Sequence, residues 1–135
     1  VPNENPRVDG VSAIVGGARL ALDGMGGVAL PRETDVELVA AVPESASESV
    51  GDPATGEASR ERLVFTWFVE AGETHYERTS FVEGVLPLER ATANRWTLPS
   101  LAEHALDSAG LVLVVRDDRG GVGWRESRVG LGGEP

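Results

Sequence analysis

The chain is 135 residues long, with 22 acidic residues, 12 basic residues, a formal net charge of −10 and no cysteine. This length suits about one domain, which can bury roughly two-thirds of its unfolded surface without disulfides or thiolate-bound metal. The acidic excess argues against nucleic acid as a partner and against adsorption to an anionic membrane, since both need clustered basic residues. The apolar runs are far shorter than the ~18 residues that cross a bilayer, so we expect no direct membrane insertion of this segment.

Residues 1–42 predict a polar entry followed by short strands. Residues 1–6, VPNENP, hold two prolines and are predicted to be a linker that arrives at the domain. Alternating apolar residues from Val8 onward predict an edge strand, and glycines divide the residues that follow into short pieces. Residues 35–42 alternate again, with Leu38 on the face that we expect to be buried.

Residues 43–61 contrast with their surroundings, because they are small, polar and acidic with almost no large apolar side chain. A stretch of this length inside a compact domain is either functional or a mobile insertion. Nothing in it has the spacing of metal or substrate ligands. We therefore predict a flexible insertion.

The strongest core signal is the run LVFTWFVEAG, which starts at Leu63. Phe65 and Trp67 fall on one face of this predicted strand. Together with Leu38 and with Val114, from the apolar run 111–115, they make up the predicted structural core. Burying one tryptophan removes ~150–250 Å² from water, so we expect Trp67→Ala to be among the most destabilising single changes.

One segment of the chain, which begins at Ser100, has the sequence signals of a helix. Ser100 and Glu103 have the spacing of a capping box, and Gly110 stands where a helix would end. These signals predict a short helix at residues 101–107. Everything else has the pattern of strand and turn, so we predict an all-β domain over residues 7–131, a sandwich of about seven strands, followed by a tail at 132–135.

Three short motifs lie along this chain. Trp67 and Gly72 form W-x-x-x-x-G, Asp117 and Gly120 form D-x-x-G between the last two predicted strands, and residues 3–6 form N-x-x-P from Asn3 to Pro6. In this combination the chain resembles the PKD and immunoglobulin-like β-sandwich modules of bacterial surface and secreted proteins. The resemblance implies an immunoglobulin-like sandwich in the cell envelope or outside the cell of a bacterium, including a lipoprotein whose anchor would precede the first residue.

Residues suited to catalysis are scarce. The two histidines, His75 and His104, are far apart in sequence, there is no cysteine nucleophile, and no serine stands in a G-x-S-x-G elbow. The glycine-rich stretch 24–27 is not followed by the helix that a phosphate-binding loop requires. We therefore predict no catalytic residue and no enzyme activity.

A cation site is a separate hypothesis. Asp117 and Asp118 would offer oxygen ligands for calcium if Asp9, Glu4 or Glu70 came together with them at one end of a sandwich. The alternative is a hairpin connection in which aspartate bonds its own backbone and glycine takes a positive φ. We favour the turn because no D-x-D-x-D-G loop is present, and we expect no cofactor other than this possible calcium.

Exposed aromatic rings would form a ligand platform. Tyr76, Trp96 and Trp124 are the candidates, with Arg125 placed to stack or pair beside Trp124. We predict a non-enzymatic binding or spacer module that makes protein–protein or adhesion contacts. The alternative is a carbohydrate-binding accessory module of a secreted enzyme or multidomain surface protein, with a surface glycan as its partner. Edge strands also permit a homodimer, so the oligomeric state stays open.

Overall fold

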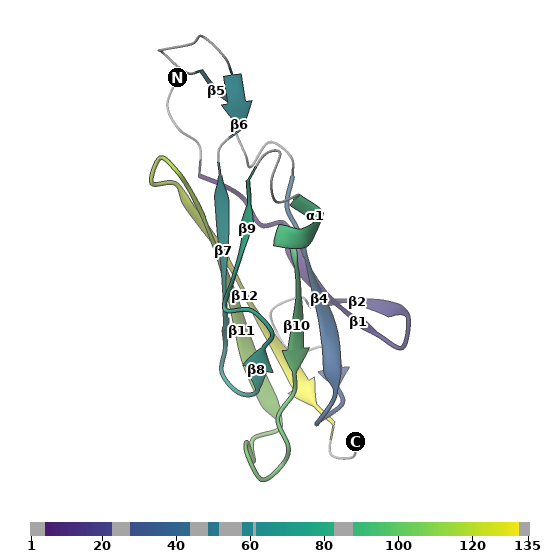
Figure 1. Ribbon diagram of the computed structural model, residues 1–135. Coiled ribbons are helices and arrows are strands. Elements are labelled where there is room, and N and C mark those ends of the chain that lie inside the picture. Colours follow the sequence, from purple (N-terminus) through teal and green to yellow (C-terminus); the bar gives the residue numbers. More distant parts are fainter. Residues whose placement is uncertain are drawn as a thin grey trace.

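The computed structural model describes residues 5–22, 28–43, 49–51, 58–60, 62–82 and 88–132 (Figure 1). Most of these residues lie in strands, which confirms the all-β prediction. The first sheet has the strand order β2-β1-β4-β10-β8. Its strands are β1 (Gly10–Val15), β2 (Ala18–Leu22), β4 (Asp35–Ala41), β8 (Glu73–Thr74) and β10 (Ala93–Thr97). All its pairings are antiparallel.

The second sheet has the order β3-β12-β11-β7-β9. Its strands are β3 (Ala29–Leu30), β7 (Leu63–Val69), β9 (Arg78–Phe81), β11 (Ser108–Asp117) and β12 (Val122–Leu131). Only β3 and β12 pair in parallel. In Figure 1 the long strands of this sheet run along one side and β4 and β10 along the other, while the β1–β2 hairpin extends outward.

Side chains from both sheets fill one hydrophobic core. Leu38 on β4 and Phe65 on β7 are fully buried, and Trp67 is 3% exposed. Val114, which the sequence placed in the core, is only half-buried and faces outward. The inward positions of β11 are Leu111, Leu113 and Val115. The prediction for Val114 was wrong because β11 is apolar in both phases, so its pattern alone does not select the inner face.

The predicted count of about seven strands was too low, since the described residues hold twelve. Short pieces such as β3 and β8, each two residues long, account for part of the difference. Two more strands, β5 (Ser49–Gly51) and β6 (Ala58–Arg60), pair antiparallel inside the predicted insertion 43–61. The remainder of that insertion, at 44–48, 52–57 and 61, lies outside the described residues.

The predicted helix at 101–107 is absent, and the one helix in the described residues is α1 (Leu88–Ala91). The capping box does form: Ser100 N–H donates to Glu103 Oε1 at 3.0 Å and Glu103 N–H to Ser100 Oγ at 3.2 Å. Two carbonyls beyond it, however, accept from the side chain of Arg32. Gly110, predicted as the helix end, lies in β11. No described helix is long and apolar enough to cross a bilayer.

The described end of the predicted linker packs on the domain. Pro6 is buried, and Val122 N–H donates to Asn5 Oδ1 at 3.3 Å. A Cβ added to Gly123 would lie 1.9 Å from the Pro6 carbonyl oxygen, so glycine at this position allows the close approach of the two backbones. Residues 1–4, with Asn3 of the N-x-x-P motif, and the tail residues 133–135 lie outside the described residues.

Gly72, the glycine of the tryptophan motif, is required by its surroundings. It has φ +78°, and a Cβ there would lie 2.3 Å from the Thr97 carbonyl oxygen and 3.0 Å from Trp96 Nε1. We expect Gly72→Ala to destabilise the protein by about 2–3 kcal/mol in urea unfolding. Gly120→Ala is the matched control, since Gly120 has φ +84° but open space around it; it should cost about 1–2 kcal/mol. Equal losses would show that the contact at Gly72 adds nothing.

Candidate binding surface

Apolar side chains gather on the outer face of the second sheet. We call this surface the apolar face: Val64, Phe68, Val112, Val114 and Trp124. The strand register sets Val114 beside Trp124 on one side and Val112 beside Phe68 on the other. Trp124 is 65% exposed and Phe68 53% exposed. Directly opposed side chains in a sheet lie ~4.5–5.5 Å apart at Cβ, so the pairs Val114–Trp124 and Val112–Phe68 lie within contact range across three strands. Val64 lies opposite Arg116, at the edge of this surface.

Charged residues flank the apolar face. Arg78 on β9 lies across from Thr66, and Arg116 follows Val114 in the same phase of β11. Glu126 and Arg128 occupy the outward positions of β12 beyond Trp124. An apolar centre with arginine around it is the composition of protein interfaces, which are enriched in aromatic residues and arginine.

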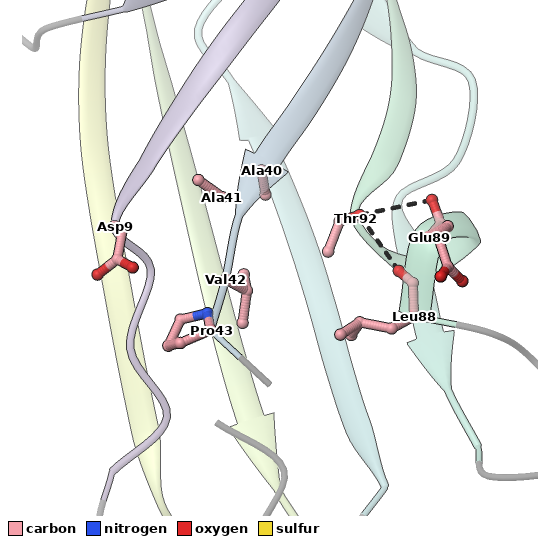
Figure 2. A pocket seen from close by; sticks show the side chains of 8 residues that line it. All are labelled: Asp9, Ala40, Ala41, Val42, Pro43, Leu88, Glu89 and Thr92. Atoms are coloured by element: carbon pink, nitrogen blue, oxygen red, sulfur yellow. Dashed lines mark hydrogen bonds between the residues drawn. The ribbon is translucent and has the colours of Figure 1, made fainter. Parts of the chain in front are cut away.

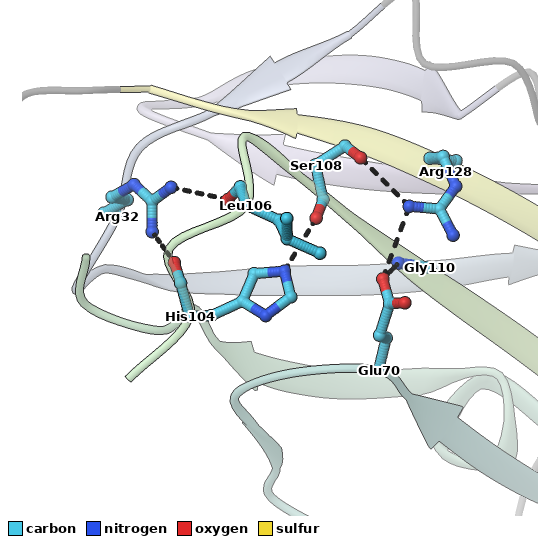
Figure 3. Close-up of polar contacts among 7 residues, drawn as sticks. All are labelled: Arg32, Glu70, His104, Leu106, Ser108, Gly110 and Arg128. Atoms are coloured by element: carbon cyan, nitrogen blue, oxygen red, sulfur yellow. Dashed lines mark hydrogen bonds and ion pairs between the residues drawn. The ribbon is translucent and has the colours of Figure 1, made fainter. Parts of the chain in front are cut away.

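One end of the apolar face is hollowed. A depression of about 410 Å³ lies between Phe68, Val112 and Glu126, and Gly110 adds no side chain to fill it. Glu70 and Arg128 border it as an ion pair at 3.3 Å, and Arg128 also donates to Ser108 Oγ at 3.0 Å (Figure 3). The depression is therefore apolar on its floor and charged at its border.

The N–H of Gly110 donates to Glu70 Oε1 at 3.0 Å and, with the guanidinium of Arg128, lowers the pKa of Glu70 below its ordinary value of 4.5. A depressed carboxylate pKa stabilises the fold above the unfolded-state pKa, and this contribution disappears as the pH falls through the folded-state pKa. We expect Glu70→Gln to reduce the loss of stability on acidification below pH 4.5, measured as urea midpoints at pH 6, 4 and 3. An unchanged acid profile in the variant would contradict this role.

The four predicted ligand residues are not brought together. Trp96 is fully buried in the first sheet, where its Nε1 donates to the Ala71 carbonyl at 3.0 Å, so the prediction of Trp96 as a platform was wrong. Arg125 points to the opposite side of β12 from Trp124, because neighbouring strand residues alternate. Tyr76 is 54% exposed but lies between β8 and β9, against the ring of His75. Trp124 alone stands on the apolar face.

The side chains of the two aspartates in the last hairpin accept hydrogen bonds from backbone N–H groups. Asp117 Oδ1 accepts from the N–H groups of Arg119 and Gly121, at 2.9 and 2.7 Å, and Gly120 takes φ +84°. Asp118 Oδ2 accepts from Arg62 N–H at 3.0 Å. Glu70 follows the far end of β7, away from Asp117, so the predicted convergence with that residue is wrong. No group of three acidic or histidine side chains in the described part of the chain suits a metal; calcium at Asp117 and Asp118 stays a prediction.

A second depression, of about 310 Å³, lies between the end of β4 and α1 (Figure 2). Its floor holds apolar side chains, including Ala40, Val42 and Leu88. Asp9, Glu89 and Thr92 supply its polar side chains. Thr92 donates from Oγ1 to the carbonyls of Leu88 and Glu89 at 3.2 and 3.4 Å. That hydroxyl therefore closes the helix rather than facing a ligand.

Of the apolar face, sequence reasoning placed Trp124 alone on a binding surface; Val114 was assigned to the core, and Val64, Phe68 and Val112 were missed. Val64 and Phe68 belong to the core-strand run that starts at Leu63, and Val112 belongs to the apolar run 111–115. The signal was available: LVLVV on β11 and LVFTWFV on β7 are apolar in both phases, whereas a solvated sheet face normally alternates with polar residues. Two neighbouring strands with this property predict an outer face that is covered by something.

Comparison with protein-family models gives no match, and neither does comparison with curated proteins. Among solved structures, a nucleoside hydrolase-related hypothetical protein from Saccharophagus degradans, described as associated with carbohydrate metabolism, is similar with 12% sequence identity and a TM-score of 0.43. The match covers 93% of this chain and 26% of that chain, so this chain spans about a quarter of that protein's length. A likeness at this level carries no conclusion about fold or function.

Proposed function

We propose that this chain is a non-enzymatic binding module of immunoglobulin-like architecture that docks a protein partner on its apolar face. The strand order supports the architecture. Within the first sheet, the strand order β1-β4-β10-β8 matches the order A-B-E-D of immunoglobulin domains. Within the second sheet, the order β12-β11-β7 matches G-F-C. From this architecture and the PKD-like motifs we further propose that the module works outside the cell or in the envelope.

The exposure of Trp124 and Phe68 on the same sheet face, with Val112 and Val114 of β11 between them, is the observation that carries the binding role. Large exposed apolar patches on a sheet face lower solubility and are found at interaction sites. Tryptophan with arginine nearby is also the composition of the few residues that dominate binding energy at interfaces. The half-buried Val112 and Val114 give the patch a flat, apolar centre, which favours a protein surface over a hydroxyl-rich glycan.

A capture experiment with three forms of the protein tests this function. The wild type, the double variant Phe68→Ser/Trp124→Ser and the control Tyr76→Ser are immobilised and exposed to secreted and envelope proteins of the cells that make the protein. Since all three side chains are exposed, each variant should keep its stability within about 0.5–1 kcal/mol. We expect the wild type and the control to retain the same protein and the double variant to lose it.

Retention of the same protein by the double variant would contradict the proposal. A parallel titration of the wild type with a glycan panel follows tryptophan emission, to which Trp124 contributes the exposed ring. A glycan that shifts this emission in the wild type and not in Trp124→Ser would favour the carbohydrate-binding alternative instead.

A further inference from the structure

A second apolar feature projects from the loop between β10 and β11. We call residues 98–107 the leucine loop. Leu101 is 58% exposed and Leu106 62% exposed, so both leucines point into solvent although neither serves the core. These two side chains and the rings of the apolar face account for four of the five large hydrophobic residues that are exposed in the described part of the chain.

The leucine loop is held in one shape by a buried arginine. Arg32 is 3% exposed, and its guanidinium donates to the carbonyls of His104 and Leu106 at 2.7 Å each (Figure 3). It also donates to the Ser100 carbonyl at 3.3 Å. The reciprocal bonds of the capping box fix the start of the loop, and His104 Nε2 contacts the Ser108 carbonyl at 2.8 Å near its end. The two leucines are thus presented on a preorganised frame, which reduces the entropy lost on binding.

Backbone strain accompanies this frame. Glu33, which follows Arg32, has φ +56°, a left-handed conformation that costs a non-glycine residue about 1–2 kcal/mol. Strain of this kind persists where the surroundings over-determine the backbone, and it concentrates at functional segments. Here the strained turn directs Arg32 into the loop.

The charges of the two apolar features are opposite. Glu33, Glu103 and Asp107 are exposed on or beside the leucine loop. Around the apolar face stand Arg78, Arg116 and Arg128 with Glu70 and Glu126, a local charge of +1 in a chain of net charge −10. The net negative charge makes copies of this chain repel each other, whereas the acidic leucine loop of one copy and the apolar face of another carry opposite local charges and attract.

We propose that the leucine loop of one copy docks on the apolar face of a second copy, head to tail. This inference rests on the proposed function, because it uses the same docking face and names its partner. The depression of about 410 Å³ beside Phe68 and Val112 would receive a leucine side chain, with Arg128 at its border facing the acidic groups of the loop. In the head-to-tail arrangement each pair of copies uses one loop and one face, so the contact is heterologous, and an open assembly keeps a free loop at one end and a free face at the other.

Complementation between two variants tests this arrangement. The loop variant Leu101→Asp/Leu106→Asp keeps the apolar face, and the face variant Phe68→Ser/Trp124→Ser keeps the leucine loop. In sedimentation equilibrium over rising concentration, we expect the wild type to pass beyond the dimer mass and each variant to stay monomeric. An equimolar mixture of the two variants should form a 1:1 dimer and nothing larger, because one intact loop meets one intact face.

A conservative variant separates the contact from the folding of the loop. Leu101→Met/Leu106→Met should keep self-association within about threefold of the wild type, whereas the aspartate pair should weaken it at least tenfold. Circular dichroism and thermal midpoints, compared with the wild type, establish that every variant is folded.

Three results would overturn the proposal: a wild type that stays monomeric, a loop variant that associates like the wild type, or a mixture that stays monomeric while the wild type associates. The second result would indicate a symmetric contact between two apolar faces. A monomeric wild type that still captures a different protein through Phe68 and Trp124 would overturn self-assembly and keep the proposed function. A wild type that neither self-associates nor captures another protein would overturn the self-assembly and the proposed function.

Discussion

Replacing Trp96 with alanine should destabilise the protein by about 3–5 kcal/mol, the largest loss that we expect from any single substitution. Trp96 is fully buried, pairs with Val36 and Thr74 in the first sheet, and donates from Nε1 to the Ala71 carbonyl. The variant leaves both a large cavity and an acceptor without its donor. Urea unfolding followed by circular dichroism measures the loss without relying on tryptophan emission.

Two controls separate the parts of this effect. Trp96→Phe keeps most of the volume but removes the Nε1 donor, so it should lose about 1–3 kcal/mol. Trp124→Ala removes the same type of side chain from an exposed position and should stay within about 0.5–1 kcal/mol of the wild type. A loss at Trp124 as large as that at Trp96 would mean that the apolar face is buried in the folded protein.

Replacing Arg32 with alanine should destabilise the protein by about 3 kcal/mol and release the leucine loop. Three carbonyls would lose a charged donor at once, and bonds to charged groups are worth about 1.5–3 kcal/mol each before the loop rearranges. The net effect is smaller than the sum because burying a guanidinium among neutral carbonyls is itself costly, and its Nε has no partner in the described residues. Urea unfolding gives the loss of stability, and amide hydrogen exchange locates it.

The expected exchange pattern is local. Amide protection should fall in residues 98–107 and stay unchanged in β7 and β11, whose ladder does not depend on Arg32. Glu33→Gly is the matched neighbour: it relieves the left-handed strain, keeps Arg32 and should stabilise the protein by up to about 1 kcal/mol. Uniform loss of protection across the sheets in Arg32→Ala would show that Arg32 supports the whole fold instead.

Local patterns in the sequence were sufficient for several features of this fold. The alternation around Leu38 and Trp67 predicted buried strand faces, and both residues lie in the core. The D-x-x-G turn of Asp117 and Gly120 joins β11 and β12, with the aspartate bonding the backbone two and four residues ahead. Each of these depends on residues close together in the chain, which is where propensity and periodicity carry information.

The features that were missed depend on residues far apart in the chain. The capping box at Ser100 is a correct local signal, but its continuation into a helix is prevented by Arg32, which lies 68 residues earlier. The burial of Trp96 depends on Ala71 and Gly72 from the turn between β7 and β8, and its own neighbours in sequence gave no sign of this. The binding face needed the pairing of β7, β11 and β12, which set Phe68 and Trp124 on one side.

The apolar character of β11 on both sides has a consequence for folding fidelity. A slip of one residue would exchange its leucine-rich side for its valine side and still bury apolar groups, so hydrophobicity discriminates weakly between native and misaligned hairpins. The exposed tip at 117–121 provides the discrimination, because Asp117 can bond the amides of Arg119 and Gly121 in one alignment only. The specificity of this strand pairing is therefore encoded at the solvent-exposed tip rather than in the interior.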